Sequence, residues 1–397
     1  MLTPAQAETL IEQHLACLPI ESLPLTQAAG AVLRENIYAE RDHPPFDRVA
    51  MDGIALLSSA AGNTGRLRVC ATQNAGDPPR KLSDPEGCIE IMTGAMLPQG
   101  CDAVVPVEQV QRTGEFAEIG RKAVTPWQNV HRRGSDCQQG ALLLSAGTRL
   151  SAPEVAIAAG AGMARLRVSA QPMIVVISTG NELVEPGDVI EPHQVRRSNA
   201  YGITAALRQH GFARVADDHV RDDEAELTER LGFHLRTHDV LILSGGVSMG
   251  RLDLVPKVLE KLGVSLVFHH VAQRPGKPMW FGVSQSGPAV FALPGNPVST
   301  LVCLSRYVLP ALRAAMGQAT GEAPRIALTA PVEVKVPLAY YLPVKMKSDD
   351  WGRTSAEPRP TNGSGDFTSL AGTDGFVELP PGPQSFPKGF VARFFRW

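Results

Sequence analysis

Three loops of small residues between positions 244 and 299 carry the residue types that bind a phosphorylated ligand. Their sequences are SGGVSMGRLD (244–253), RPGKP (274–278) and LPGNPVS (293–299). The first and third follow short apolar runs at 239–243 and 289–292, a pattern typical of strands in a parallel α/β sheet. In such sheets ligands bind at the carboxyl ends of the strands, where backbone N–H groups favour an oxyanion.

Each loop taken alone is also compatible with a tight strand-to-helix turn. Their occurrence together, with the positive charges of Arg274 and Lys277 in the second loop, favours a ligand site. The loop residues expected to line it are Ser244, Gly245, Gly246, Ser248, Gly250, Arg274, Lys277, Pro294, Gly295 and Asn296.

Acidic residues recur in the predicted loops of the same region. Glu182 follows the sequence STGN, Asp222 follows Arg221, and Asp253 ends the first small-residue loop. Carboxylates beside a phosphate site are suitable for Mg²⁺, which takes oxygen ligands and keeps several waters. Each acid alone is equally explained as a helix N-cap or a solvated turn, and Asp222 above all, because RDDEAEL is a good helix start.

The first half of the chain offers weaker signals. Asp52 precedes Gly53, and Asp-Gly by itself indicates a turn, while Asp136 ends the sequence RRGSD, which also suits a solvated turn. His43, His269 and His270 show no metal-ligand spacing, and we take them as structural. Without a G-x-S-x-G motif, a Walker loop or a Cys/His pairing, the sequence has no candidate for covalent nucleophilic catalysis.

The bulk properties narrow the class of protein. A chain of 397 residues is too long for one hydrophobic core, so two to four domains are expected. A net charge of −2 disfavours a nucleic-acid partner, and no apolar run is long enough to span a membrane. Six scattered cysteines without a C-x-x-C pair indicate structural thiols in a reducing cytoplasm and make a zinc site improbable.

The secondary-structure pattern predicts a multidomain α/β plus β protein. A helical pattern runs from Thr3 to about Arg34, and short alternating runs at 67–71, 88–92 and 103–107 indicate a small β insert. Strands and helices alternate from about residue 172, which predicts a doubly wound α/β domain closed by a helix at 297–315. The remainder is β-like, with a polar and mobile loop at 347–367. The expected domains are a discontinuous N-terminal mixed domain (1–43 and 141–171), the β-rich insert (44–140), the α/β domain (172–317) and a C-terminal β domain (318–397).

Seven ordered segments resemble a known family. They are PPFDRVAMDG, IMTGAMLPQGCDAVVPVE, RRGSDC, STGNEL, SGGVSMGRLD, RPGKP and LPGNPVS. In order and spacing they are similar to the molybdopterin molybdenumtransferases, the MoeA type that is also found as the E domain of gephyrin. The similarity runs from the first helix to about residue 316 and is weaker in the last domain, where GSGDFTSLAGTDGFVELPPG carries it.

The resemblance implies an elongated four-part homodimer whose active site lies between subunits. It implies a reaction in which molybdate is inserted into adenylylated molybdopterin with release of AMP, aided by Mg²⁺. A molybdopterin adenylyltransferase and recipient apoenzymes would be further partners. By match to the motifs, the functional acids would be Asp52, Asp136, Glu182, Asp222 and Asp253, with Mg²⁺ on Glu182 and Asp253. The nucleotide and molybdate sites would be lined by Ser248, Lys277, Pro278, Pro294, Pro297 and Ser299, with Arg274 and Lys277 receiving molybdate.

The chain also departs from the family pattern. Ile54 stands where most relatives have Tyr, Arg274 where they have Lys, and Arg197 where they have Asp. Pro343 aligns with a basic residue, and Arg197 is a candidate to replace that lost cation. These changes leave two alternatives open beside the active enzyme: a paralogue that uses tungstate, or a non-catalytic carrier or scaffold that binds the pterin.

Overall fold

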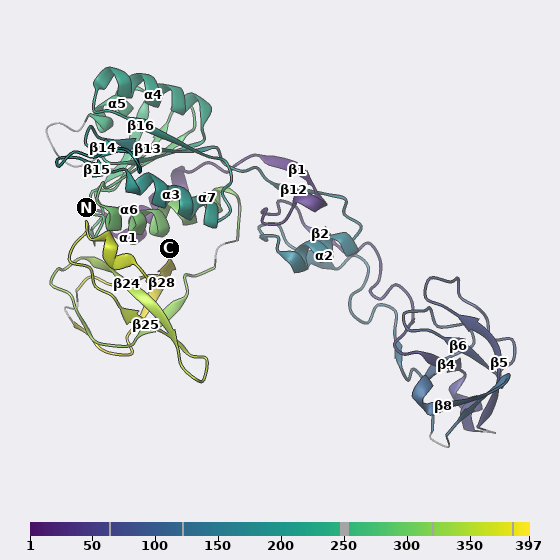
Figure 1. The fold of residues 1–397 in the computed structure, drawn as a ribbon. Coiled ribbons are helices and arrows are strands. Elements are labelled where there is room, and N and C mark those ends of the chain that lie inside the picture. The colour runs from purple at the N-terminus through teal and green to yellow at the C-terminus, as the bar shows by residue number, and fades with distance from the viewer. Residues whose placement is uncertain (63–64, 121–122, 247–253, 320, 383–384) are drawn as a thin grey trace.

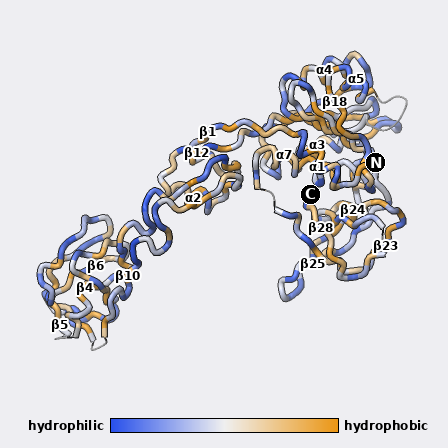
Figure 2. Tube along the Cα trace, turned by 180° about the vertical axis from the view of Figure 1, so that it is seen from behind, coloured by the Kyte–Doolittle hydropathy of each residue, from blue (hydrophilic) through white to orange (hydrophobic). Residues whose placement is uncertain are grey.

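The computed structural model describes residues 1–62, 65–120, 123–246, 254–319, 321–382 and 385–397. Figure 1 shows an elongated molecule: an α/β unit packs on a C-terminal β unit at one end, and a small β unit lies at the other. A linking unit built around α2 connects them. Figure 2 shows hydrophobic stretches in each of these bodies, as expected for a chain too long for one core. Among the described residues, no helix combines the length and apolarity that crossing a bilayer requires.

The central α/β unit is built on a six-stranded sheet in the order β16-β13-β17-β21-β20-β18. The first four strands are parallel, whereas β20 and β18 are antiparallel additions at one edge. The buried apolar runs predicted as strands are confirmed, because parallel strands covered on both faces are apolar throughout. The strands are β13 (Ile174–Thr179), β16 (Val215–Val220), β17 (Val240–Ser244), β18 (Val264–His269), β20 (Trp280–Ser284) and β21 (Ala289–Leu293).

Helices cover both faces of this sheet, so the predicted doubly wound fold is confirmed. Ile174 and Val176 face a core shared with α3, α6, η4, α7 and the N-terminal helix α1. Val175 and Ile177 face the opposite core, shared with α4 and α5. The helical elements are α1 (Pro4–His14), α3 (Ser198–Gln209), α4 (Glu224–Thr237), α5 (Val255–Lys261), α6 (Pro297–Cys303), the π-helical turn η4 (Leu304–Val308) and α7 (Leu309–Ala315).

The N-terminal helix is shorter than the sequence pattern predicted. It begins behind a Thr3 capping box and ends at His14, so the predicted continuation to Arg34 is wrong. Pro19 and Pro24 limit the segment to extended backbone, and β1 (Ile20–Pro24) pairs with β12 (Arg165–Ser169) in the linking unit. The other elements of that unit are η1 (Leu25–Gln27), β2 (Ile37–Tyr38), β11 (Leu142–Leu144) and α2 (Ala152–Gly160).

The β insert is a six-stranded sheet in the order β7-β4-β6-β5-β9-β8, as its alternating runs predicted. Apolar side chains form one cluster on each of its faces. Its elements are β3 (Arg48–Val49), β4 (Gly53–Leu56), η2 (Ser58–Gly62), β5 (Arg66–Gln73), β6 (Cys88–Ile91), β7 (Ala103–Pro106), η3 (Val107–Gln109), β8 (Val110–Thr113), β9 (Phe116–Ile119) and β10 (Val130–His131).

The C-terminal β unit is a sheet in the order β19-β24-β25-β22-β28-β26, closed by a further pairing of β24 with β26. The loop expected at 347–367 is wrong over its first part, because β24 and β25 form a hairpin there. Its polar composition reflects one solvated face, on which Lys347 pairs with Glu357, while Ala356 faces the core. The elements are β19 (Gln273–Arg274), β22 (Arg325–Leu328), β23 (Val332–Glu333), β24 (Ala339–Ser348), β25 (Thr354–Pro358), η5 (Phe367–Leu370), β26 (Gly375–Leu379), β27 (Ser385–Phe386) and β28 (Val391–Arg396).

Candidate active site

The carboxyl ends of the parallel strands bring the predicted loops to one edge of the central sheet. Ser178 of β13 is in register with Ser244 of β17, which is in register with Leu293 of β21. The RPGKP loop reaches the same edge, because it lies between the end of β18 and the start of β20, and Trp280 there pairs with Ala292. The chain order reverses direction across the sheet between β13 and β17, which is where ligands bind in such folds.

Asn199 in the first turn of α3 ties two of these loops together. Its amide nitrogen donates to the Ser244 hydroxyl at 2.9 Å and to the Gly295 carbonyl at 2.7 Å. One side chain therefore fixes the end of β17 relative to the LPGNP loop. The sequence analysis did not assign it a role, although it directly follows the Arg-Arg-Ser segment that drew attention to Arg197.

The two glycines after β17 are required by space and by backbone conformation. Gly245 and Gly246 have φ of +102° and +67°, where only glycine is unstrained. A Cβ on Gly245 would lie 2.8 Å from the Thr179 carbonyl oxygen, and one on Gly246 would lie 2.7 Å from a Val255 methyl. The backbone after β17 can therefore pack directly against Thr179 and Val255, which a residue with a side chain could not do. Ser248, Gly250 and Asp253, predicted in the same loop, lie outside the described residues.

The LPGNP loop is held from both sides by hydroxyl groups. The Thr300 hydroxyl donates to the Pro294 carbonyl at 2.6 Å, and the Asn296 amide donates to the Ser364 hydroxyl at 2.8 Å. The backbone of Ser364 also accepts from the Val298 N–H at 3.0 Å, so the C-terminal β unit contacts the site. Ser364 belongs to the GSGDF segment, whose similarity to the family was the available sequence signal.

The side chains predicted to receive an anion differ in their exposure. Arg274 and Lys277 are exposed and Pro278 is half-buried on the RPGKP loop, and Gly295 and Asn296 are exposed on the LPGNP loop. Pro297 begins α6, while Ser299 is buried within the first turn of that helix. Arg274 and Lys277 can therefore meet a ligand that arrives from solvent, whereas Ser299 lies inside the protein.

Two of the predicted acids lie close together at the ends of neighbouring strands. Glu182 follows β13 and Asp222 follows β16, both with exposed side chains, and the Asn181 side chain accepts from the Asp222 backbone N–H at 3.2 Å. Within the described part of the chain, no group of three or more His, Cys, Asp or Glu side chains is arranged to hold a metal ion. Mg²⁺ commonly takes one or two protein carboxylates and completes its shell with waters and substrate phosphates, so exposed carboxylates at this edge suit it.

The Arg197 side chain is buried and binds neighbouring side chains of the same chain. Its guanidinium is 5% exposed, pairs with Glu185 and Asp217, and donates to the Ser178 hydroxyl at 3.0 Å. Burial opposes ionisation of Glu185, but hydrogen bonds from Tyr201 and Arg197 outweigh it and lower the pKa of that carboxyl. The idea that Arg197 replaces a lost cation at the ligand site is therefore wrong, because its donors are committed to neighbouring side chains.

The remaining departures from the family pattern are buried in sheets. Ile54 is 3% exposed on β4 and packs in the core of the β insert. Pro343 is buried on β24 opposite Phe376, and its carbonyl accepts from the Arg359 N–H at 2.8 Å. The Ile54 side chain therefore belongs to the core of the β insert and not to the edge of the central sheet that carries the loops.

Asp52 and Asp136 lie in the region around the β insert, which Figure 1 shows at the opposite end of the molecule from β13. The Asp52 carboxylate accepts from the Thr93 hydroxyl and backbone N–H, both at 2.6 Å, and these bonds lower the pKa of Asp52. Gly53 beside it must be glycine, because a Cβ would lie 2.0 Å from the Val105 carbonyl oxygen.

Asp136 accepts from His131 Nε2 at 2.7 Å, and His131 Nδ1 faces Arg48 at 3.2 Å. Because Arg48 can only donate, His131 Nδ1 is the acceptor and Nε2 carries the proton. Within one chain the structure therefore makes two separate clusters of the predicted acids, one at the central sheet and one around the β insert.

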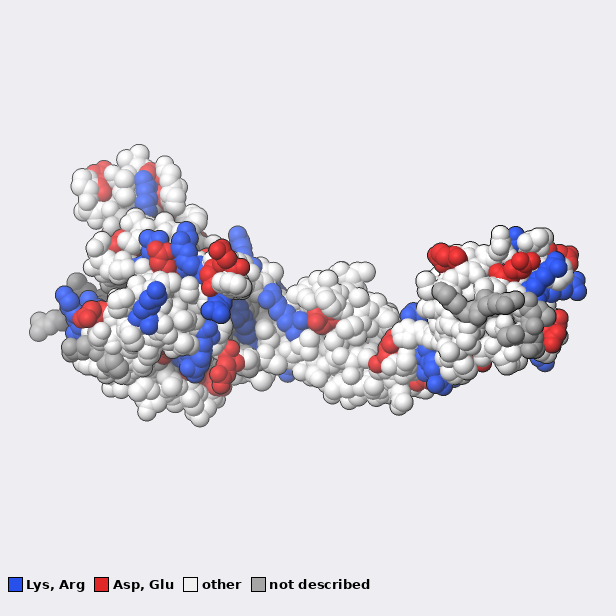
Figure 3. All heavy atoms as spheres, turned by 90° about the horizontal axis from the view of Figure 1, so that it is seen from below, with Lys and Arg blue, Asp and Glu red and all other residues white. Residues whose placement is uncertain are grey.

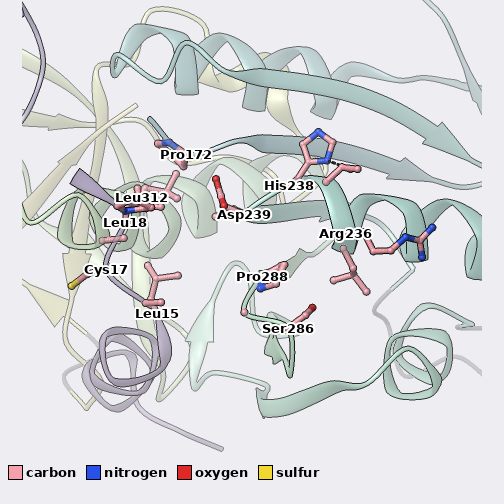
Figure 4. Close-up of a pocket in the computed structure, with 17 residues that line it drawn as sticks. Leu15, Cys17, Leu18, Pro172, Arg236, His238, Asp239, Ser286, Pro288 and Leu312 are labelled. Atoms are coloured by element: carbon pink, nitrogen blue, oxygen red, sulfur yellow. Dashed lines mark hydrogen bonds between the residues drawn. The ribbon is translucent and has the colours of Figure 1, made fainter. Parts of the chain in front are cut away.

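A cavity of about 550 Å³ lies at the other end of the central sheet (Figure 4). Its lining includes residues just before the starts of three parallel strands: Pro172 before β13, Asp239 before β17 and Pro288 before β21. It is separate from the loops at the carboxyl ends. On the face in Figure 3, Lys and Arg alternate with Asp and Glu and form no broad basic surface, so any anion site on this face is local.

Comparison with known proteins covers nearly the whole chain. Three family models match: "MoeA N-terminal region (domain I and II)" at residues 2–162, "Probable molybdopterin binding domain" at 175–314, and "MoeA C-terminal region (domain IV)" at 325–394. A molybdopterin molybdenumtransferase from Synechocystis is 40% identical over 401 residues, which is 100% of both chains. One from Haemophilus influenzae is 34% identical over 80% of this chain and 78% of its own. The crystal structure of a molybdopterin biosynthesis MoeA protein from Pyrococcus horikosii is similar with a TM-score of 0.82 and 31% identity, covering 100% of this chain and 99% of its own.

Proposed function

The chain belongs to the family of molybdopterin molybdenumtransferases, transferases of molybdenum cofactor biosynthesis, and we propose that it inserts molybdate into adenylylated molybdopterin with release of AMP. The observation that carries this proposal is the convergence of the SGG, RPGKP and LPGNP loops at one edge of the central sheet. Asn199 links the first of these loops to the third. This arrangement offers backbone donors and two exposed cations to a phosphorylated pterin and to molybdate.

We propose that Arg274 and Lys277 receive molybdate, a dianion, beside the dithiolene of the pterin. Both side chains are exposed at the rim of the site, and a guanidinium can present two parallel donors to an oxyanion. Ser244, Gly245 and Gly246, together with Pro278, Pro294, Gly295, Asn296, Pro297 and Ser299, would line the pocket for the adenylylated pterin. We expect Ser248, Gly250 and Asp253 to complete it.

We propose that Glu182 holds Mg²⁺ together with Asp253, and that Asp222 supports the same site. The exposed carboxylates of Glu182 and Asp222 supply the oxygen donors that this ion prefers. When bound, the ion would neutralise charge on the phosphoryl oxygens as the link to AMP breaks. The residues of the chain then have to hold the two phosphates and keep the pterin beside molybdate, and no covalent nucleophile is required.

We further propose that the protein acts as a homodimer in which Asp52 and Asp136 of one subunit complete the site of the other. The separation of the two acid clusters within one chain supports this arrangement. The six free cysteines are consistent with a cytoplasmic location, where thiols stay reduced. A molybdopterin adenylyltransferase is the expected source of the substrate, and molybdoenzyme apoproteins are the expected recipients.

The test is AMP release by the purified protein with adenylylated molybdopterin, Mg²⁺ and increasing molybdate. Molybdate-dependent release is the expected result, with a raised molybdate requirement in Lys277→Ala and the fold of that variant intact by circular dichroism. Arg236→Ala removes a cation at the cavity on the opposite edge of the sheet and, as the control, should leave release unchanged. Tight pterin binding without any AMP release would instead identify a carrier, and a lower KM for tungstate than for molybdate would identify a tungstate enzyme.

A further inference from the structure

Gln273 closes the base of the RPGKP loop from inside the protein. The residue is fully buried, and its side-chain amide donates to the Gly276 carbonyl at 3.1 Å across the loop. Gly276 leaves no room for a side chain, because a Cβ would lie 2.6 Å from Cys303 Sγ and 2.7 Å from Gln273 Nε2. The buried Gln273 amide is therefore one of the contacts that hold the loop presenting Arg274 and Lys277.

Tyr307 fixes the orientation of that amide. Its hydroxyl donates to Gln273 Oε1, which leaves the amide nitrogen to face Gly276. Burial raises the pKa of Tyr307, so the hydroxyl stays protonated and remains a donor. Tyr307 lies in the π-helical turn η4, and such turns redirect side chains out of the regular helical pattern.

The C-terminal β unit holds this pair in place. The hydroxyl of Tyr341 on β24 lies 3.2 Å from the hydroxyl of Tyr307. Strand β24 also pairs with β19, which consists of Gln273 and the first residue of the RPGKP loop, Arg274. Arg306, next to Tyr307, is fully buried and pairs with Glu8 at 2.9 Å and with Glu378 at 3.1 Å. Ion pairs to α1 and to β26 therefore fix η4 between the central unit and the C-terminal β unit.

We propose that Gln273 and Tyr307 are positioning residues for the oxyanion loop 274–278, and that the C-terminal β unit sets the loop's position through Tyr341. The proposal rests on the proposed function, since it assigns these residues to the molybdate-receiving loop. Neither side chain needs to contact molybdate. The chain Tyr341–Tyr307–Gln273–Gly276 sets where the cations of the loop stand, and so affects capture of the oxyanion more than the later chemical step.

The experiment measures AMP release against molybdate concentration at saturating adenylylated molybdopterin and Mg²⁺. Tyr307→Phe removes one buried hydroxyl and its hydrogen bond to Gln273, which contributes about 1 kcal/mol. We therefore expect the KM for molybdate to rise roughly fivefold, because about 1.4 kcal/mol corresponds to a tenfold change. We expect kcat to stay within about twofold of the wild type. Tyr341→Phe, which alters the outer end of the chain, should give a smaller rise and serves as a second variant if Tyr307→Phe folds poorly. Tyr38→Phe, an exposed tyrosine of the linking unit, is the matched control and should change neither constant.

A double-mutant cycle distinguishes positioning from a general loss of stability. In an Arg274→Ala, Lys277→Ala background, Tyr307→Phe should have no further effect on the KM, because the cations that it positions are absent. A full additional effect in that background, or an unchanged KM in folded Tyr307→Phe and Tyr341→Phe, would overturn the positioning role alone. An unchanged KM in the Arg274→Ala, Lys277→Ala protein itself would overturn the proposed molybdate role of the loop, and the positioning role with it.

Discussion

The two regions that carry the predicted functional residues are built in opposite ways. At the central sheet, the loops are held by partners inside the fold: half-buried Asn199 links two of them, and fully buried Gln273 supports the third. Around the β insert, the acids are held by partners near the surface, with Asp52 on Thr93 and Asp136 on His131. Exposure of the Asp136 side chain is 53%, whereas Gln273 is fully buried.

This difference indicates that the central sheet and the β insert have different roles. Buried donors that are already satisfied preorganise a site before its ligand arrives, which suits loops that must hold phosphates and an oxyanion. Exposed carboxylates remain available for contact with a second subunit or its ligand, which suits a surface that completes a neighbouring site. The comparison thus favours a preorganised site at the sheet edge and a contributing surface on the insert, and experiments can test each half.

The largest effect is expected from mixing subunits. At a molybdate concentration well below the KM of Lys277→Ala, the Asp136→Ala and Lys277→Ala homodimers should both be nearly inactive if each site needs both regions. A heterodimer with one change on each chain contains one site with both changes and one with neither. Tandem-affinity-purified heterodimers should therefore regain about half of the wild-type rate per dimer in the AMP-release assay. Activity that stays absent would show that both residues serve the same chain.

The second-largest effect is expected from Glu182, the proposed ligand of Mg²⁺ at the central site. Glu182→Gln keeps the shape of the side chain but removes its charge, so AMP release should fall on the order of a hundredfold. Raising Mg²⁺ should restore part of the rate if Glu182 binds the ion. Glu191→Gln, an exposed glutamate nine positions further along the chain, is the matched control. Equal losses in both variants, or no response to Mg²⁺, would contradict the assignment.

A smaller effect compares a half-buried support at the central sheet with an exposed one on the insert. Asn199→Ala removes hydrogen bonds to Ser244 and Gly295, so the free energy of unfolding should fall by about 1–2 kcal/mol. Thr93→Val removes the hydroxyl that supports exposed Asp52, and its stability should change by less than that. Urea denaturation of both variants measures the difference. A larger loss in Thr93→Val would reverse the comparison between the two regions.

Sequence patterns predicted the strands and loops at the centre of the α/β unit but not the contacts that join them. The apolar runs of β13, β17 and β21 followed by glycine predicted strands and loops, because a covered parallel strand has a distinctive composition. Asn199 meets Ser244 across 45 positions, and Asn296 meets Ser364 across 68. Those pairings depend on how the helices pack and on where the C-terminal unit docks, and no local pattern encodes either.

The errors of the sequence analysis have the same origin. Arg197 was a candidate to replace a lost cation because Glu185 and Asp217, which pair with it, belong to other elements. The segment after His14 kept a helical pattern, yet pairing with β12 made it a strand. Composition at 347–367 indicated a loop, although polar residues there form the solvated face of a hairpin. Tertiary contacts decided each of these cases over local preference.

The smallest effect concerns acid stability, and it separates buried carboxylates from exposed ones. Asp218 of β16 is 9% exposed and accepts from His234 at 2.6 Å and from Arg230 at 2.5 Å. Burial opposes its ionisation, but these bonds outweigh it and lower the pKa of Asp218 to about 2. A lowered carboxyl pKa stabilises the fold above the unfolded value and loses that contribution as the pH falls toward the folded value.

The pH window therefore runs from about 4 down to about 2, and about 1 kcal/mol of the Asp218 contribution should be gone by pH 3. Asp218→Asn should flatten the fall in unfolding free energy across this window, measured by urea denaturation at each pH. Asp52→Asn should flatten it much less, because the Asp52 carboxylate is exposed and its partners remain in contact with solvent. If both variants reduced the pH dependence of the unfolding free energy equally, the carboxylates of the insert would be as strongly stabilised as Asp218. The contrast between a preorganised site and a contributing surface would then be wrong.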